Sequence, residues 1–326
     1  MALLVNKPLV LVSQIQRSGG SLIAQLFDAH PQCLAHPFEI HIGFPQKWQW
    51  PVFQINQHAI DEAQIKIWFG QLFEKKLMVF IQQGYAKPGS NAFAAEEKFE
   101  FDFSIDIQWQ QFLRTLQNQL KTTTSLNSRN ILDAYFDSFF KAWRNHQPTG
   151  KERIITGFTP RINMYEKSTR LFFNDYDDGK LISIIRDPLS WYASSHKHNI
   201  HHQDIEFALN EWLHSTQSII QAFNEFGETK VLPISYQQLL NSPQTTMEKI
   251  AHFSGIDYSD CLLTPSFLGQ PVKPNSSFQI NSRGINRDML LHHQCLNAAQ
   301  IKQINALTQS MRHRANELLL DTEAIR

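Results

Sequence analysis

Residues 9–27 read LVLVSQIQRSGGSLIAQLF. The apolar run Leu9–Ser13 suits a strand that is buried on both faces, and Ser21–Phe27 has the apolar spacing of a helix. Between them lies a short turn that contains Gly19 and Gly20. A strand, a glycine loop and a helix in this order predict the opening of a βαβ unit.

The same alternation of strands and helices continues along the chain. We predict further strands over Arg153–Gly157, Lys180–Ile185 and Lys230–Ser235. Helical patterns cover Asn130–Asn145, Pro188 toward Asn199, Ile205–Phe226, Gln237–Ser254 with a break near Pro243, and Ala298–Leu320. This order predicts an α/β fold with a three-layer parallel β-sheet flanked by helices. Because no repeat or low-complexity linker interrupts the chain, we expect a single domain over residues 1–326.

Residues 44–128 differ from the rest of the chain in composition. They are rich in Trp, Phe and Gln, and they carry helical patterns near Ile60–Lys76 and Ile107–Leu120. We interpret this part as a largely helical insertion. Two roles fit its aromatic residues equally well, namely an acceptor pocket or lid, and helices that cover the edge of the sheet.

The composition limits the kinds of ligand and compartment. Thirty basic and 30 acidic residues balance to zero formal charge, which predicts no nucleic-acid partner and requires a local site for any anion. Cys33, Cys261 and Cys295 are scattered without CxxC spacing, as in a reducing compartment. No signal peptide and no apolar run of about 18 residues is present. We therefore expect a cytoplasmic protein without a membrane span; its oligomeric state stays open.

The first candidate binding segment is the glycine loop at residues 17–22. Its glycines allow successive backbone N–H groups to face an anion, and the following helix adds its positive end. Arg17 supplies a cation and Ser21 a hydroxyl group. A nucleoside-triphosphate P-loop has a lysine before the helix, and the absence of one here disfavours a kinase or an ATPase.

The second candidate segment follows the predicted strand Lys180–Ile185. Arg186 lies at the carboxyl end of that strand, which is where open α/β sheets bind ligands. Ser194 comes eight residues later, about two helical turns on, so both side chains can reach one phosphate. The alternative is that Arg186 pairs with the neighbouring Asp187 and that Ser194 only packs.

Together the two segments resemble the 5′-phosphosulfate loop and the 3′-phosphate motif of sulfotransferases that use 3′-phosphoadenosine 5′-phosphosulfate (PAPS), especially the bacterial, P-loop-like branch. The stretch from Ile234 to Pro243 resembles the family's strand-Tyr-acidic-x-Leu segment, with Gln in place of the acid. Residues 275–278 and 282–284 resemble its nucleotide-closing loop. The similarity covers roughly residues 8–43 and 150–310 and leaves the insertion outside it.

The resemblance implies a PAPS co-substrate, adenosine 3′,5′-bisphosphate (PAP) as product, a small-molecule acceptor and no metal. It assigns nucleotide contacts to Arg17, Ser18, Gly19, Gly20, Ser21, Leu22, Arg186, Ser194, Tyr236, Ser277, Arg283 and Gly284. Arg17 also receives a catalytic role, because an in-line transfer needs developing charge to be neutralised.

The acceptor must lose a proton, so a base is expected near the 5′ end of the nucleotide. Relatives whose first helix ends in the Asp-x-His-Pro pattern, here residues 28–31, commonly have a glutamate just after it. Glu39 is therefore the first candidate, His41 the second and His36 the third. Each histidine also fits a purely structural role in a loop.

One departure concerns the lysine that many relatives have just before the proline matching Pro160. In relatives that lysine is thought to steady the bridging oxygen of the leaving group. Phe158 and Thr159 stand in its place, so either Arg161 or Arg17 takes over this role, or the transition state is supported differently. This departure also leaves open a non-catalytic nucleotide-binding protein of the same fold. A P-loop-like phosphotransferase is the other alternative.

The segment 196–202 contains four histidines. His198 and His202 are four residues apart and could share a helix face, as metal ligands do. The spacing indicates no cysteine or carboxylate partner, so we interpret the segment as a solvated or acceptor-facing cluster.

Overall fold

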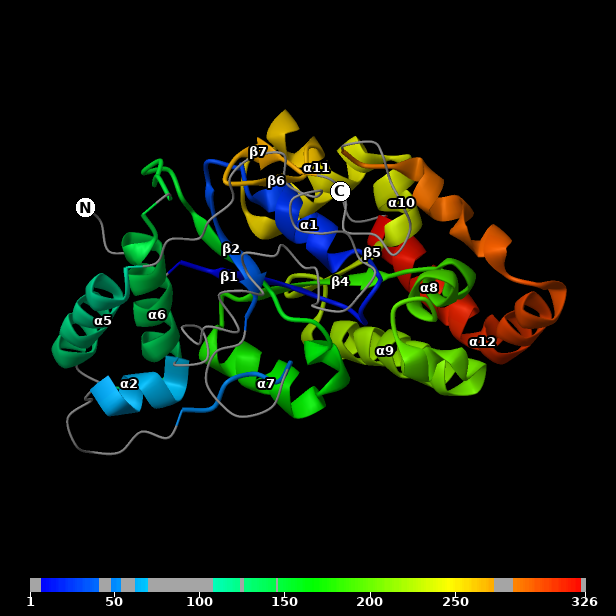
Figure 1. The fold of residues 1–326 in the computed structure, drawn as a ribbon, viewed down its shortest axis with the longest axis horizontal. Coiled ribbons are helices and arrows are strands. Elements are labelled where there is room, and N and C mark those ends of the chain that lie inside the picture. Colours follow the sequence, from blue (N-terminus) through cyan, green and yellow to red (C-terminus); the bar gives the residue numbers. More distant parts are fainter. Residues whose placement is uncertain are drawn as a thin grey trace.

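The computed structural model describes residues 7–40, 48–53, 62–69, 108–123, 126–144, 146–272 and 284–323. Its centre is a five-stranded, fully parallel sheet of order β2-β3-β1-β4-β5 (Figure 1). The strands are β1 Leu9–Ser13, β2 Cys33–Glu39, β3 Ile154–Phe158, β4 Lys180–Ile185 and β5 Val231–Ser235. The predicted α/β class with a parallel sheet is therefore confirmed.

Strand β2 has no counterpart among the predicted strands. Its sequence CLAHPFE contains a proline and lacks a clean alternation of apolar and polar residues. A proline is tolerated because β2 is an edge strand, which pairs only with β3. The register shifts between Ala35 and Glu39, so β2 is irregular where it approaches its carboxyl end.

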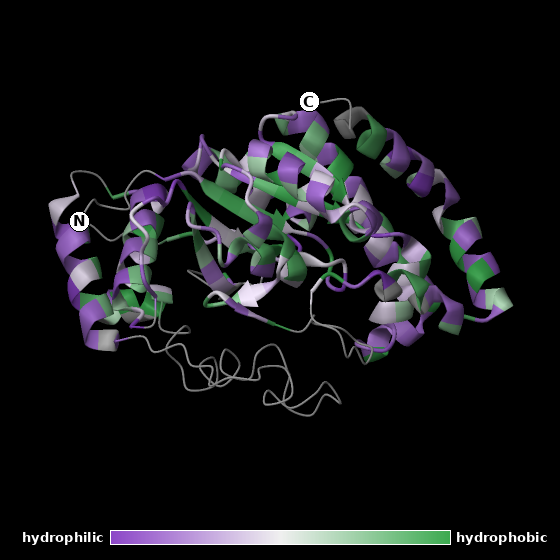
Figure 2. Cartoon of the chain, turned by 90° about the horizontal axis from the view of Figure 1, so that it is seen from above, coloured by the Kyte–Doolittle hydropathy of each residue, from purple (hydrophilic) through white to green (hydrophobic). Residues whose placement is uncertain are grey.

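Helices cover both faces of the sheet, as the alternation of residues in β1 requires. Val10 and Val12 pack on α1 (Gly20–Phe27) and α11 (Pro243–Ser254). On the opposite face, Leu9 and Leu11 belong to the core that includes α6 (Ser128–Ala142) and α7 (Glu166–Asp175). The three-layer arrangement is visible in Figure 1, and Figure 2 shows the apolar strands enclosed between mixed helices.

Several predicted boundaries are reproduced. The long helix α9 spans Ile205–Phe226 as expected, and β4 has the predicted bounds. The break at Pro243 is confirmed, because α10 (Tyr236–Asn241) ends before it and α11 begins on it. Proline lacks a backbone N–H, and the first helical position does not need one.

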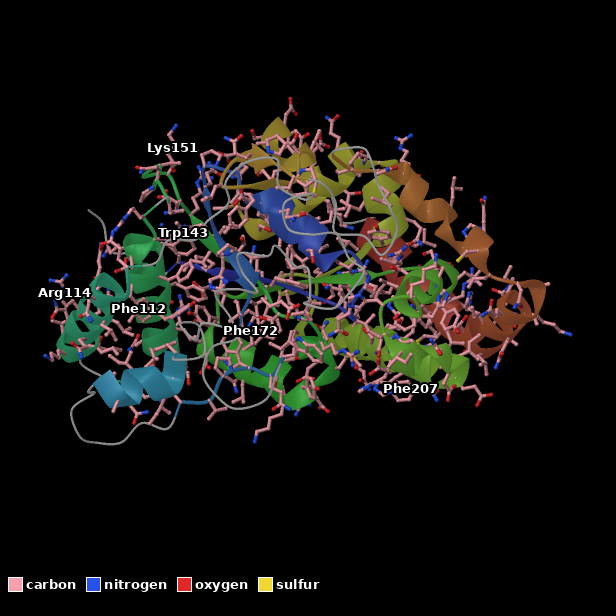
Figure 3. The ribbon with its side chains drawn as sticks, viewed as in Figure 1. Phe112, Arg114, Trp143, Lys151, Phe172 and Phe207 are labelled. Carbon is pink, nitrogen blue, oxygen red and sulfur yellow. The ribbon has the colours of Figure 1, made fainter. Side chains whose placement is uncertain are left out.

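The described part of the insertion packs as a helical layer beside the sheet. It comprises α2 (Glu62–Phe69) and α5 (Trp109–Thr122), both against α6. The rings of Phe69 and Tyr135 stack with centroids 4.9 Å apart. In Figure 3 Phe112 lies toward α6, whereas Arg114 points outward. These aromatic side chains fit the packing interpretation; the pocket or lid role stays a prediction, since residues 54–61 and 70–107 lie outside the described ranges.

The C-terminal part of the chain packs at the β5 end of the sheet (Figure 1). Helix α8 (Pro188–Ser195) and the 3-10 segment η5 (Arg287–Cys295) precede α12 (Ala298–Glu323) in the chain. Helix α12 packs against α9, β5 and α8. Among the helices that the structure describes, none is long and apolar enough to cross a membrane.

Candidate active site

The glycine loop lies between the end of β1 and the start of α1, at the carboxyl edge of the sheet. Gly19 has φ +104°, a left-handed conformation that glycine adopts without strain. A Cβ atom at Gly19 would lie 2.5 Å from the Tyr236 ring, and one at Gly20 would lie 2.5 Å from the Phe158 ring. Close packing therefore opposes a side chain at both positions, and at Gly19 the positive φ is a second reason for glycine.

The loop offers several donors to an anion. Gly20 and Ser21 are the first residues of α1, whose N–H groups have no acceptor within the helix. Ser18 is 1% exposed, and its Oγ atom has no hydrogen-bond partner among the described residues. Because buried polar atoms are normally hydrogen-bonded, an unpaired hydroxyl at this position is unusual.

Replacing Gly19 by alanine tests how tightly the loop is held. We expect Gly19→Ala to lower the free energy of unfolding by about 1–3 kcal/mol, because it combines positive φ with a clash against Tyr236. Gly150→Ala is the matched control, since Gly150 has φ +76° but no neighbour within 4 Å of an added Cβ. Denaturant unfolding of both variants separates the two effects. Equal losses would show that packing against Tyr236 contributes nothing.

The second segment forms the turn from β4 into α8, with the cap that the sequence predicts. The Asp187 side chain accepts hydrogen bonds from the N–H groups of Leu189 and Ser190, and Pro188 is the first helical residue. Arg186 therefore stands directly after the strand, and Ser194 lies in the last turn of the buried helix α8.

The two segments meet at the edge of the sheet. The Nη1 atom of Arg186 donates to the backbone oxygen of Arg17 at 2.7 Å. The Nε atom of Arg17 lies 3.3 Å from Ser194 Oγ. Strands β1 and β4 are neighbours in the sheet, so their carboxyl ends bring residues 169 positions apart into contact.

Two cations lie at this meeting point, the half-buried Arg17 and the buried Arg186. Arg186 is 2% exposed, and its guanidinium carbon lies 4.5 Å from the centroid of the Tyr236 ring. Burial, together with the charge of Arg186, lowers the pKa of Arg17 to about 10. Burial likewise lowers the pKa of Arg186. Among the described residues, no carboxylate forms an ion pair with Arg17. A buried cation with a second cation nearby is costly on its own, and a bound anion would offset that cost.

The three candidate bases have different surroundings. Glu39 lies at the carboxyl end of β2, paired in register with Phe158, and the indole Nε1 of Trp48 donates to its carboxylate at 3.3 Å. His36 is buried in the aromatic core, with its Nε2 atom 2.9 Å from the Tyr135 hydroxyl. His41 lies outside the described residues. Glu39 is thus on the same edge of the sheet as the glycine loop, whereas His36 packs against α6.

The position of the missing lysine is filled by packing. The Phe158 ring lies against Gly20, and Thr159 is buried with its Oγ1 atom unpartnered within the described ranges. Arg161 is held by Glu211 through two hydrogen bonds of 2.6 and 2.9 Å. Because the Arg161 guanidinium is paired with Glu211, Arg17 is the better candidate to steady the leaving-group oxygen in place of the missing lysine.

The histidine segment differs from the prediction at one residue. His198 and His201 are exposed, as a solvated cluster requires, but His202 is only 3% exposed. Its Nδ1 atom contacts Ser195 Oγ, and its Nε2 atom lies 2.9 Å from Glu211. A solvated position is therefore wrong for His202, because the 3-10 turn Ile200–Gln203 directs its ring inward, while the acceptor-facing alternative stays a prediction. The described residues contain no cluster of three or more potential metal ligands.

Two further residues of the site escape a motif search. The Gln237 side chain accepts from the Asp187 N–H at 3.3 Å and donates to Ser190 Oγ at 3.2 Å. Ser190 Oγ in turn is 3.2 Å from the Nε atom of Arg186. In the sequence, the only sign of this link between Asp187 and Ser190 is that Gln237 stands where the family has an acidic residue. Of the expected closing loop, Ser277 and Arg283 lie outside the described residues, and Gly284 has φ +87°.

A parallel sheet of order β2-β3-β1-β4-β5, with a glycine turn between β1 and α1, defines a P-loop-like α/β protein. The comparisons with known proteins make this class specific. The model of the sulfotransferase family matches residues 8–260, so the chain belongs to the sulfotransferase family.

Solved structures show the same fold. A sulfotransferase domain from the Synechococcus PCC 7002 olefin synthase has 15% identity and a TM-score of 0.51, and the match covers 94% of this chain and 95% of that one. A sulfotransferase domain from the curacin biosynthetic pathway has 12% identity and a TM-score of 0.50, with 94% and 98% coverage. No curated protein matches the chain in sequence.

Proposed function

We propose that this protein transfers a sulfuryl group from PAPS to a hydroxyl or amine of a small acceptor by in-line displacement. The observation that carries the proposal is the convergence of two cations from separate segments, the half-buried Arg17 and the buried Arg186, beside a Ser18 hydroxyl without a partner in the described ranges. A ligand with anionic groups at two ends matches two converging cationic segments.

The residues at the sheet edge fit the nucleotide. The amides of Ser18 to Ser21 and the Arg17 guanidinium would hold the 5′-phosphosulfate, in the manner of a helix N-terminus that binds an anion. Arg186 and Ser194 would hold the 3′-phosphate, with Tyr236 packed between Arg186 and Gly19. The Gly284 amide, with Ser277 and Arg283, would form the second clamp.

The bound nucleotide supplies the activated sulfuryl group. Glu39 would take the proton of the acceptor, since it ends β2 on the edge that carries the loop. Arg17 would neutralise the charge that develops on the leaving phosphate oxygen. A sulfuryl group carries less charge than a phosphoryl group, so fixed cations and amides suffice in this mechanism and no metal is required.

Ligand-induced stabilisation provides the test. At concentrations 100-fold above its dissociation constant, a ligand that binds only the folded state adds about 2.7 kcal/mol. We expect PAP to raise the melting temperature strongly, adenosine 5′-monophosphate (AMP) weakly, and ATP with magnesium least. A shift with ATP and magnesium alone would contradict the proposal and favour a phosphotransferase.

Transfer of labelled sulfate from PAPS to alcohols, phenols and amines then tests catalysis. A protein that binds PAP tightly and transfers sulfate to none of these acceptor classes would favour the non-catalytic alternative.

A further inference from the structure

The second segment, Arg186 to Ser194, is proposed to bind the 3′-phosphate, yet it contains the carboxylate of Asp187, which opposes the binding of an anion. Asp187 follows Arg186 directly, so an unengaged Asp187 would compete with a phosphate for that guanidinium. It would also place a negative charge beside a dianion, where repulsion weakens binding. The structure shows how this carboxylate is kept occupied.

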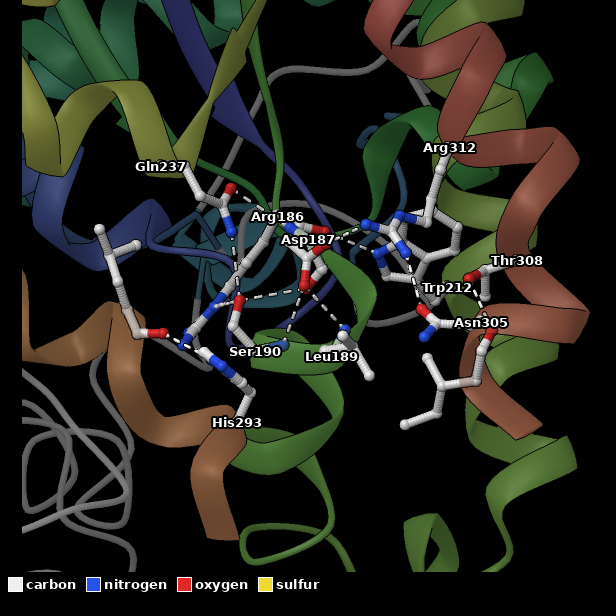
Figure 4. A network of polar contacts seen from close by, with 12 residues as sticks. Arg186, Asp187, Leu189, Ser190, Trp212, Gln237, His293, Asn305, Thr308 and Arg312 are labelled. Carbon is white, nitrogen blue, oxygen red and sulfur yellow. Dashed lines mark hydrogen bonds and ion pairs between the residues drawn. The ribbon is translucent and has the colours of Figure 1, made fainter. Parts of the chain in front are cut away.

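Both oxygens of Asp187 have partners, and the network is drawn in Figure 4. The Oδ1 atom accepts from the N–H groups of Leu189 and Ser190, at 3.0 and 3.3 Å. The Oδ2 atom lies 3.2 Å from Nη2 of Arg312. The helix cap therefore engages one oxygen, and an arginine from elsewhere in the chain engages the other.

Arg312 comes from α12, which lies beyond the residues 8–260 that match the family model. Its Nη1 atom donates to Asn305 Oδ1 at 2.8 Å, about two turns earlier on the same helix. The guanidinium is thus held between its own helix and Asp187 (Figure 4). Helix α12 also packs on α8, so this link is part of a helix contact.

The opposite side of Arg186 is held independently. The Trp212 indole donates to the Arg186 backbone oxygen at 2.9 Å, and Ser190 Oγ lies against its Nε atom. The guanidinium itself is oriented by the donation of Nη1 to the Arg17 backbone oxygen and by the Tyr236 ring, and a competing carboxylate would oppose that orientation. Arg312 removes the nearest carboxylate from that competition.

We propose that Arg312 is a positioning residue for recognition of the 3′-phosphate. By engaging Asp187, it leaves Arg186 directed to the nucleotide, so the preference for 3′-phosphorylated adenosine depends on the C-terminal helix. This inference rests on the proposed function of Arg186 as a phosphate ligand.

The test compares two nucleotides that differ in the 3′-phosphate. Isothermal titration of Arg312→Gln should give an affinity for PAP about fivefold weaker than wild type, and an affinity for AMP changed by less than about twofold. Arg314→Gln is the matched control, because Arg314 lies on the same helix and contacts Gln217 instead. It should leave both affinities unchanged.

A second variant distinguishes positioning from mere stabilisation. In Arg312→Gln/Asp187→Asn the competing charge is gone, and the Asn oxygen still caps α8. This double variant should bind PAP within about twofold to threefold of wild type. Arg312→Lys, which keeps the charge, should retain most of the affinity.

Three outcomes would overturn the inference: an unchanged ratio of PAP to AMP affinity in Arg312→Gln, an equal loss for both nucleotides, or no recovery in the double variant. The failure of the proposed function looks different. In that case the wild-type protein itself would not prefer PAP over AMP.

Discussion

Glu39→Gln is expected to slow sulfuryl transfer by about 10²–10⁴-fold while leaving PAP affinity within about twofold of wild type. Glutamine keeps the size of the side chain and an oxygen that can accept from Trp48, but it cannot take a proton. Single-turnover rates with PAPS and a working acceptor, with PAP titrations alongside, measure the two effects separately.

The control for this variant is Glu166→Gln, because Glu166 is exposed in an ion pair with Arg170 on α7. It should turn over at the wild-type rate. If Glu39→Gln transfers sulfate normally and His41→Ala does not, the base is His41 and the assignment of Glu39 is wrong.

Arg186→Gln is expected to weaken PAP binding by about 10²-fold or more and AMP binding only slightly. Losing one partner of a buried, charge-assisted contact typically costs about 2–5 kcal/mol, and each 1.4 kcal/mol is a factor of ten. Arg186 is almost fully buried, so solvent cannot screen its charge or replace it. The selective loss follows because AMP lacks the 3′-phosphate.

Titration calorimetry with both nucleotides measures this effect, and Arg170→Gln is the control. Arg170 is half exposed and pairs with Glu166 and Glu225 on the surface, so its loss should change neither affinity. Equal weakening of PAP and AMP would show that Arg186 supports the site as a whole. No weakening would remove it from nucleotide binding.

Much of the sheet could be predicted because buried parallel strands carry a strong local signal. Leu9–Ser13 and Lys180–Ile185 are continuous apolar runs, and both form strands with those bounds. Strand β2 gave no such signal, since an edge strand tolerates a proline and irregular register. It is nevertheless the strand that places Glu39, so the candidate base was identified by resemblance and its position by the fold.

The polar partners could not be predicted, because they are contacts between residues far apart in the chain. From the sequence, Arg161 is a candidate to replace the missing lysine. In the fold its guanidinium is paired with Glu211, which lies 50 positions away in the chain. His202 looked solvated in a run of polar residues, yet a short turn buries it beside the same carboxylate. Local spacing carries no information about such partners.

By itself, the order of residues determined two things: an α/β chain of alternating strands and helices, and two short segments whose glycines, cations and hydroxyls suit an anion. Those features depend on backbone conformation and side-chain type, which act over a few residues. Only the tertiary structure decided that Arg17 and Arg186 touch, that Arg161 is already paired, and that Arg312 engages Asp187. Each of these depends on which strand ends and helices become neighbours, and packing of the whole sheet settles that.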